Sequence, residues 1–117
     1  MRLDSDCIRD TLLAIEKYQN YNDWLEFSYL KSTKGLAQYP PEEIEYTLNM
    51  LKDGNLIEIE YDYSHEVYIK KITWNGYKFL DSIRNPKAWR KIKEAVATVG
   101  SASLPKLIEI AFKGLGM

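Results

Sequence analysis

Residues 39–77, YPPEEIEYTLNMLKDGNLIEIEYDYSHEVYIKKITWNGY, decide the fold. Two prolines and two glutamates open the stretch; proline is tolerated in a first helical turn, and carboxylates complement the positive end of the helix dipole. Apolar side chains then recur at i, i+4 and i+7: Ile44, Leu48 and Leu51. Gly54 and Asn55 end this pattern, so the sequence predicts a helix over residues 41–53 with one apolar face.

Two β-rich runs follow the helix stop, over residues 56–63 and 66–72. They are close enough in sequence to pair only as an antiparallel hairpin, with a loop of about four residues around Ser64 and His65. Thr73 is a good N-cap type and predicts a further helix over residues 73–83. Helix, stop, hairpin and helix form the second half of a winged helix-turn-helix, so we expect an α+β fold with a β-hairpin wing.

The N-terminal third is predicted to complete this fold. Asp4 caps a first helix over residues 4–19, whose apolar stripe is Ile8, Leu12 and Ile15. A turn at 20–23 precedes a short strand at 24–28, which suits pairing with the later hairpin. Ser28 is then expected to cap a weak second helix over residues 29–38, because serine, threonine and glycine lower its helix propensity.

Three helices are expected in the C-terminal part of the chain, each with an apolar stripe. In the helix at 73–83 the predicted core residues are Trp74, Tyr77, Leu80 and Ile83. Asn85 and Pro86 start a helix at 87–99 with a second stripe: Trp89, Ile92, Val96 and Val99. After a break at 100–103, a last apolar stripe repeats with helical spacing: Leu104, Leu107, Ile108, Ala111 and Phe112.

The last stripe must be covered, either by the core of the same chain or by a partner. A two-fold dimer is the commonest oligomer, so we expect a homodimer with this stripe at its interface. The predicted organisation is a winged-helix domain over 1–85 and a helical extension over 86–117.

Composition narrows the class of protein. At 117 residues, with 45% hydrophobic and 28% charged residues, the chain suits one ordinary soluble domain. No run approaches the ~20 apolar residues of a membrane span, and an acidic residue at position 4 disfavours a signal peptide. The single cysteine, Cys7, forms no internal disulfide. We therefore expect a cytoplasmic protein without membrane contact.

Charge is distributed unevenly although the net charge is only −1. Residues 1–69 hold 6 basic against 14 acidic residues, whereas residues 70–117 hold 10 against 3. Such asymmetry indicates either a footprint for a polyanion or two halves that attract each other within the fold or between subunits.

A DNA-reading surface is the leading functional interpretation. In a helix-turn-helix, the exposed face of the helix at 41–53 enters the major groove, but here it is mostly acidic. The candidate contacts on this helix, the hairpin and the helix at 87–99 are Tyr46, Asn49, Lys52, Lys70, Lys71, Lys87, Arg90 and Lys91. An ordinary solvated or protein-binding face explains the acidic helix equally well.

The sequence contains only weak signals for a metal or catalytic site. Glu58, Glu60 and Asp62 share one strand face, but no histidine is in register with them, so a solvated strand explains them better than a metal site. His65 is expected at the hairpin tip as a solvated side chain, and Cys7 as a small buried hydrophobe. We predict no catalytic residues, metal or cofactor, and no small-molecule ligand is evident.

Several motifs carry a family likeness. They are Met1-Arg2-Leu3-Asp4 with Ile8-Arg9-Asp10, Tyr46-x-Leu48-x-x-Leu51, and Ile72-Thr73-x-x-Gly76-x-x-Phe79-Leu80-Asp81, continued by Pro86, Trp89 and Lys91. Together they resemble a family of short, functionally uncharacterised winged-helix proteins of bacteria and their prophages. The resemblance covers nearly the whole chain and implies a fold but no activity. Thr47 and Tyr77 stand where such sequences often carry histidine, which weakens a metal or pH role.

Two functions follow as hypotheses. The first is a DNA-binding regulator of bacterial or prophage genes, supported by the architecture and the basic second half. The second is a protein-interaction or assembly module without nucleic acid, supported by the acidic helix and by hairpin tyrosines: Tyr61, Tyr63 and Tyr68.

Overall fold

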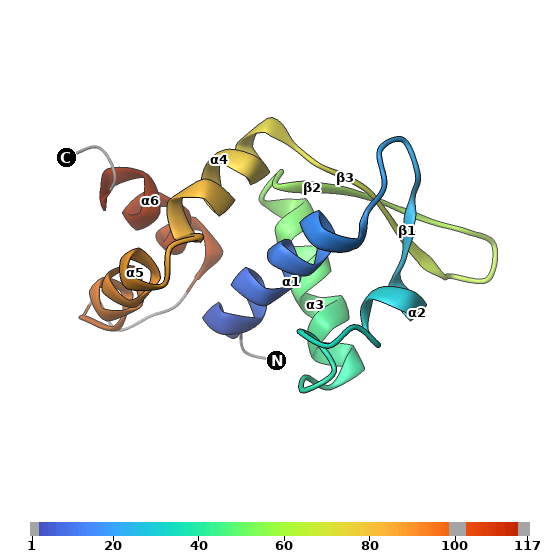
Figure 1. The fold of residues 1–117 in the computed structure, drawn as a ribbon, viewed down its shortest axis with the longest axis horizontal. Helices are drawn as coiled ribbons and strands as arrows, with labels where there is room; N and C mark the ends of the chain where they lie inside the picture. Colours follow the sequence, from blue (N-terminus) through green and yellow to red (C-terminus); the bar gives the residue numbers. More distant parts are fainter. Residues whose placement is uncertain (1–2, 99–102, 115–117) are drawn as a thin grey trace.

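The chain folds around a three-stranded antiparallel sheet with helices packed against it, an α+β architecture (Figure 1). The structure is a computed structural model that describes residues 3–98 and 103–114. In chain order its elements are α1 (Ser5–Tyr18), β1 (Leu25–Glu26), α2 (Phe27–Leu30), α3 (Pro41–Asp53), β2 (Ile57–Tyr61), β3 (Val67–Ile72), α4 (Trp74–Ile83), α5 (Pro86–Thr98) and α6 (Leu104–Gly114).

Helix α1 begins where its cap predicts. The Asp4 carboxylate accepts hydrogen bonds from the backbone amides of Asp6 and Cys7, at 2.8 and 3.3 Å. The predicted apolar stripe is completely buried, which confirms the first helix. Cys7 is also completely buried; its Sγ lies 3.8 Å from Thr11 Oγ1 and 3.4 Å from Thr47 Oγ1.

The segment after the first turn is less regular than predicted. Only Leu25–Glu26 is strand, because the chain turns into a single helical turn at Phe27. The helix predicted over residues 29–38 is wrong beyond Leu30. The hydroxyls of Ser32 and Thr33 donate to the carbonyls of Tyr29 and Leu30, both at 2.7 Å, and the chain continues in turns. These local bonds compete with helix extension. The cap position is Glu26 rather than Ser28.

Helix α3 has the predicted bounds, and its stripe of Ile44, Leu48 and Leu51 is buried. Its stop depends on Asn55, which has a left-handed φ of 62°, whereas Gly54 keeps a φ of −82°. Asparagine tolerates this conformation, so the chain reverses into β2 without a glycine at the left-handed position.

The hairpin prediction is confirmed, and the sheet order is β1-β3-β2. Strand β1 pairs with β3, as the alternation in residues 24–28 predicts. A register shift lies between Glu58 and Ile59: Glu58 pairs with Lys71, but Ile59 pairs with Ile69. This bulge leaves Lys70 as an extra residue in β3.

Helix α4 is anchored to the sheet by its cap. Thr73 Oγ1 accepts from the Gly76 amide at 3.0 Å and donates to the Asn55 carbonyl at 2.6 Å. The buried side is Gly76, Phe79, Leu80, Ser82 and Ile83. The prediction that Trp74 and Tyr77 pack on the core is wrong: they are 86% and 43% exposed, because they lie on the opposite side of the first turns.

Helices α5 and α6 close the core from the other side. Asn85 caps α5, and its predicted stripe is buried as far as Val96; Val99 and the break at 100–102 lie outside the described residues. Helix α6 packs against α4 and α5 of the same chain. None of the helices in the described ranges combines the length and apolar character needed to cross a membrane.

Candidate functional site

The exposed face of α3 carries three of the predicted contacts. Tyr46 and Asn49 are half-buried and Lys52 is exposed. The Asn49 amide is engaged at both ends: Nδ2 donates to the Glu45 carbonyl at 3.0 Å, and Oδ1 accepts from the Tyr61 hydroxyl at 2.8 Å. Base reading by Asn49 would therefore first require breaking a contact between α3 and the hairpin.

The hairpin lysines are paired with carboxylates of the neighbouring strand. Lys70 Nζ lies 4.0 Å from Glu58 and 3.8 Å from Glu60, and Lys71 Nζ lies 3.7 Å from Glu58. The bulge allows both lysines to share the Glu58 carboxylate. Each exposed pair contributes little stability, about 0.2–1 kcal/mol, but together they offset the positive charge that a phosphate would meet.

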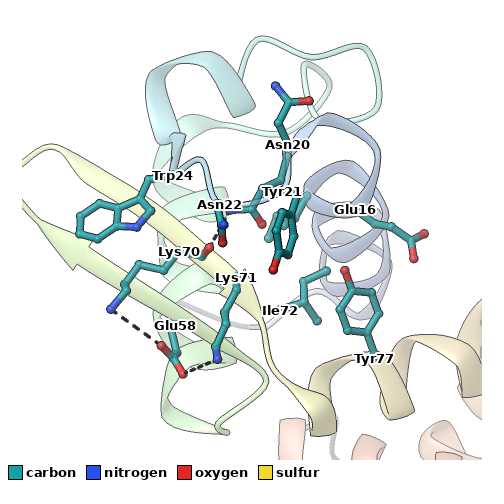
Figure 2. Close-up of a pocket in the computed structure, with 12 residues that line it drawn as sticks. Glu16, Asn20, Tyr21, Asn22, Trp24, Glu58, Lys70, Lys71, Ile72 and Tyr77 are labelled. Atoms are coloured by element: carbon teal, nitrogen blue, oxygen red, sulfur yellow. Dashed lines mark hydrogen bonds and ion pairs between the residues drawn. The ribbon is translucent and has the colours of Figure 1, made fainter.

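A groove opens between the end of α1, the loop at residues 20–24, strand β3 and helix α4 (Figure 2). Its volume is about 610 Å³. It is lined by Ile15, Glu16, Gln19, Asn20, Tyr21, Asn22, Trp24, Glu58, Lys70, Lys71, Ile72 and Tyr77. Sequence reasoning missed this groove; the only signal was two large aromatics, Tyr21 and Trp24, in a polar turn.

Every charged side chain that lines the groove has a partner in the chain. Glu58 is held by the hairpin lysines, and Glu16 accepts two hydrogen bonds from Arg84, at 2.6 and 2.9 Å. The Arg84 guanidinium lowers the pKa of Glu16 below its usual value despite partial burial. Since the two carboxylates and two lysines balance, the groove offers no unmatched charge to a ligand.

Aromatic rings form the walls of the groove. Tyr21 is 93% exposed and Trp24 52% exposed. The Trp24 and Tyr68 ring centroids lie 6.2 Å apart, and Lys70 Nζ lies 5.4 Å from the Trp24 centroid. Figure 2 shows Tyr21 and Tyr77 on opposite sides of Ile72. Exposed aromatics around an apolar floor are typical of protein interfaces.

The acids at 58, 60 and 62 do not form a metal site: Glu58 and Glu60 pair with Lys70. Asp62 turns into the hairpin loop, where Oδ1 accepts from the Ser64 amide, the Ser64 hydroxyl and the Glu66 amide at 2.7–2.9 Å. These bonds, led by the Ser64 hydroxyl, lower the Asp62 pKa. His65 is exposed at the loop tip with a φ of 66°. Within the described ranges, no three His, Cys, Asp or Glu residues are placed to hold a metal.

Helix α5 carries a separate basic face. Lys87, Arg90 and Lys91 are exposed at i, i+3 and i+4, and none forms an ion pair with a residue that the structure describes. Figure 1 places α5 and α6 at one end of the molecule and the hairpin loop at the other. The eight predicted DNA contacts therefore fall into three groups, on α3, on the hairpin and on α5.

The predicted dimer stripe on α6 is largely covered within the chain. Leu104, Leu107 and Ala111 are buried, while Ile108 and Phe112 are half-buried. Lys78 of α4 lies with its Nζ 4.8 Å from the Phe112 ring centroid. The stripe is apolar, as the sequence predicts, but α4 and α5 of the same chain cover most of it.

Comparison with known proteins gives a family. The family model described as "Hypothetical protein (DUF2513)" matches residues 2–103. An uncharacterised protein of Haemophilus influenzae (strain ATCC 51907 / DSM 11121 / KW20 / Rd) is 30% identical over 107 residues, covering 89% of this chain and 83% of the relative. No solved structure matches the chain significantly. The chain therefore belongs to the DUF2513 family of hypothetical proteins.

Proposed function

We propose that the protein is a non-enzymatic winged-helix module that binds another protein through one face of α3 and the β2–β3 hairpin. The element order from α1 to β3 supports this proposal, because it matches the order expected for a winged helix-turn-helix; α3 would then be the recognition helix and the hairpin the wing. In this reading the wing and α3 form one binding face, named here the α3–wing face: Glu42, Glu45, Tyr46, Asn49, Lys52, Tyr61 and Tyr63.

The charge of the α3–wing face carries the proposal. Lys52 is its one cation, while Glu42 and Glu45 are exposed carboxylates on the same helix. The nearby lysines of β3 are already paired with Glu58 and Glu60. A phosphate backbone approaching α3 would meet repulsion, whereas a basic protein surface would be attracted.

Tyrosines on this face supply contact area. Tyr61 is 48% exposed and is held in place by its hydrogen bond to Asn49, and Tyr63 is fully exposed at the wing. A tyrosine fixed before binding loses little conformational freedom when a partner covers it. The expected partner is therefore a protein with a basic surface and an apolar centre.

Site-specific photocross-linking tests the proposal. p-Benzoylphenylalanine is placed at Tyr61 in one variant and at Tyr29 in a control, in cells that naturally make the protein. Tyr29 is 52% exposed, so the two positions are matched in accessibility. We expect a discrete protein adduct from position 61 that is absent from position 29. Adducts of equal yield at both positions, nucleic-acid adducts at position 61, or none at all would overturn the proposal.

Binding of duplex DNA is the second candidate, as in a regulator of bacterial or prophage genes. The observation that favours it is the face of α5, where Lys87, Arg90 and Lys91 have no ion pair among the described residues. Fluorescence anisotropy with random duplex DNA at about 20 and 200 mM salt tests it. Binding at low salt that weakens steeply at 200 mM, and is reduced by Arg90→Ala, would favour DNA over a protein partner.

A further inference from the structure

We infer that the groove beside Tyr21 receives Trp74 of a second copy of the chain, in a two-fold homodimer. This inference is independent of the proposed function, because no residue that lines the groove belongs to the α3–wing face. Each copy contributes one aromatic side chain and one groove, so the contact is made twice.

Trp74 has the properties of a protruding anchor. It is the first residue of α4 and is 86% exposed, although burying an indole is among the most favourable contacts that a side chain makes. Tyr77 follows one helical turn later on the same face and lines the groove. Trp74 and the groove are therefore neighbours on one surface, as a self-complementary interface requires.

The groove suits an aromatic side chain better than a charged ligand. At about 610 Å³ it is in the range of sites that bind small molecules, so it has room for an indole ring. Ile72 contributes apolar surface at its floor, and Tyr21 and Trp24 offer exposed rings on its walls. Glu16 and Glu58 are paired with cations of the same chain, so neither needs a counter-charge from a ligand.

Electrostatics distinguish this surface from the rest of the molecule. The groove charges sum to zero, so two copies can meet there without repulsion. Two acidic hairpin loops, or two basic α5 faces, would repel each other. The acidic hairpin and the basic α5 occupy opposite ends of the molecule (Figure 1). In a dimer whose two-fold axis is perpendicular to the long axis of the molecule, the acidic hairpin of one copy therefore lies toward the basic α5 end of the other.

Sedimentation velocity of the full chain measures the association at about 1–200 μM and 150 mM salt. We expect a monomer–dimer equilibrium for the wild type. Trp74→Ala is expected to raise the dimer Kd at least tenfold, as central aromatic anchors do. Tyr21→Ala, which alters the groove wall instead of the anchor, is expected to act in the same direction.

Tyr29→Ala is the matched control, because Tyr29 is exposed but does not line the groove. It should dimerise like the wild type, and circular dichroism should show all three variants folded. A wild type that stays monomeric at 200 μM, or a Trp74→Ala variant that dimerises as tightly as the wild type, would overturn the inference.

Discussion

The side-chain amide nitrogen of Gln19 lies 2.8 Å from the carbonyl oxygen of Lys70, 51 residues further along the chain. The same nitrogen lies 2.9 Å from the Ile69 carbonyl and 3.0 Å from the Asp23 carbonyl. One amide therefore joins the end of α1, the loop at 20–24 and the bulged part of β3. These are three of the four segments that form the groove.

Replacing Gln19 by glutamate tests this junction. Glutamate has the same shape, but its carboxylate cannot donate to the three carbonyls, so Gln19→Glu should lower the free energy of unfolding by about 1–3 kcal/mol at pH 7. Urea denaturation measures the loss. Gln19→Met, which removes the polarity without adding charge, should lose less. Equal stability of Gln19→Glu and wild type would contradict the assigned hydrogen bonds.

Gly76→Ala should be severely destabilising although alanine is the better helix former. A Cβ at position 76 would lie 2.0 Å from the Leu56 carbonyl oxygen and 2.6 Å from Ile72 Cγ2, so α4 would have to move off the sheet. We expect a loss of about 3 kcal/mol or more in thermal or urea unfolding. Gly35→Ala is the control, because nothing lies within 4 Å of its added Cβ, and it should stay within about 1 kcal/mol of wild type.

Cys7 should be unreactive in the folded protein. It is completely buried, and burial raises the pKa of its thiol, so less of the nucleophilic thiolate is present near pH 8. Labelling by 5,5′-dithiobis(2-nitrobenzoate) should be at least about a hundredfold slower than in guanidinium chloride, limited by local opening. A Ser28→Cys variant adds an exposed thiol and should react in two phases, one fast and one slow. Two fast phases would show that Cys7 is accessible.

Because of the Glu16–Arg84 pair, the free energy of unfolding should decrease as the pH becomes acidic. The pKa of Glu16 is lowered in the folded state, so its contribution is present above the ordinary glutamate pKa of 4.5 and is lost as pH falls through the lowered value. Glu16→Gln should therefore cost about 0.2–1 kcal/mol at pH 7 and almost nothing near pH 3. Urea titrations across this range measure the difference.

Glu45→Gln serves as the control for that titration, because Glu45 is exposed, lies beyond the first turn of α3 and forms no ion pair with a described residue. Its effect at pH 7 should be smaller than that of Glu16→Gln. A Glu16→Gln penalty that grows as the pH falls would contradict the pairing.

The elements with strong local signals were predictable from sequence. Helix α3 combines proline and glutamates at its start with an i, i+4, i+7 stripe, and its bounds agree with the structure. The caps Asp4, Thr73 and Asn85 were likewise predicted from residue type and are confirmed by their hydrogen bonds. In each case the deciding interactions lie within a few residues, where sequence patterns are informative.

Features that depend on distant contacts were not predictable. The second helix ends after Leu30 because two hydroxyls bond locally instead. The exposure of Trp74 depends on where α4 meets the sheet, which helical spacing does not specify. The groove brings together residues from Ile15 to Tyr77, and no periodicity links them. An apolar stripe such as that of α6 shows that a face is covered but not by what.

The contacts of Asp6 also bear on when the molecule can complete its fold. Its carboxylate accepts from the Trp89 indole at 2.9 Å and from Lys93 at 3.0 Å, partners 83 and 87 residues away. Arg9 similarly binds the carbonyls of Ile83 and Arg84. At 5–20 residues per second, the ribosome adds Trp89 roughly 4–17 s after Asp6. Helix α1 therefore cannot form these contacts until α4 and α5 have been synthesised, and the first residues to be synthesised are among the last to reach their final neighbours.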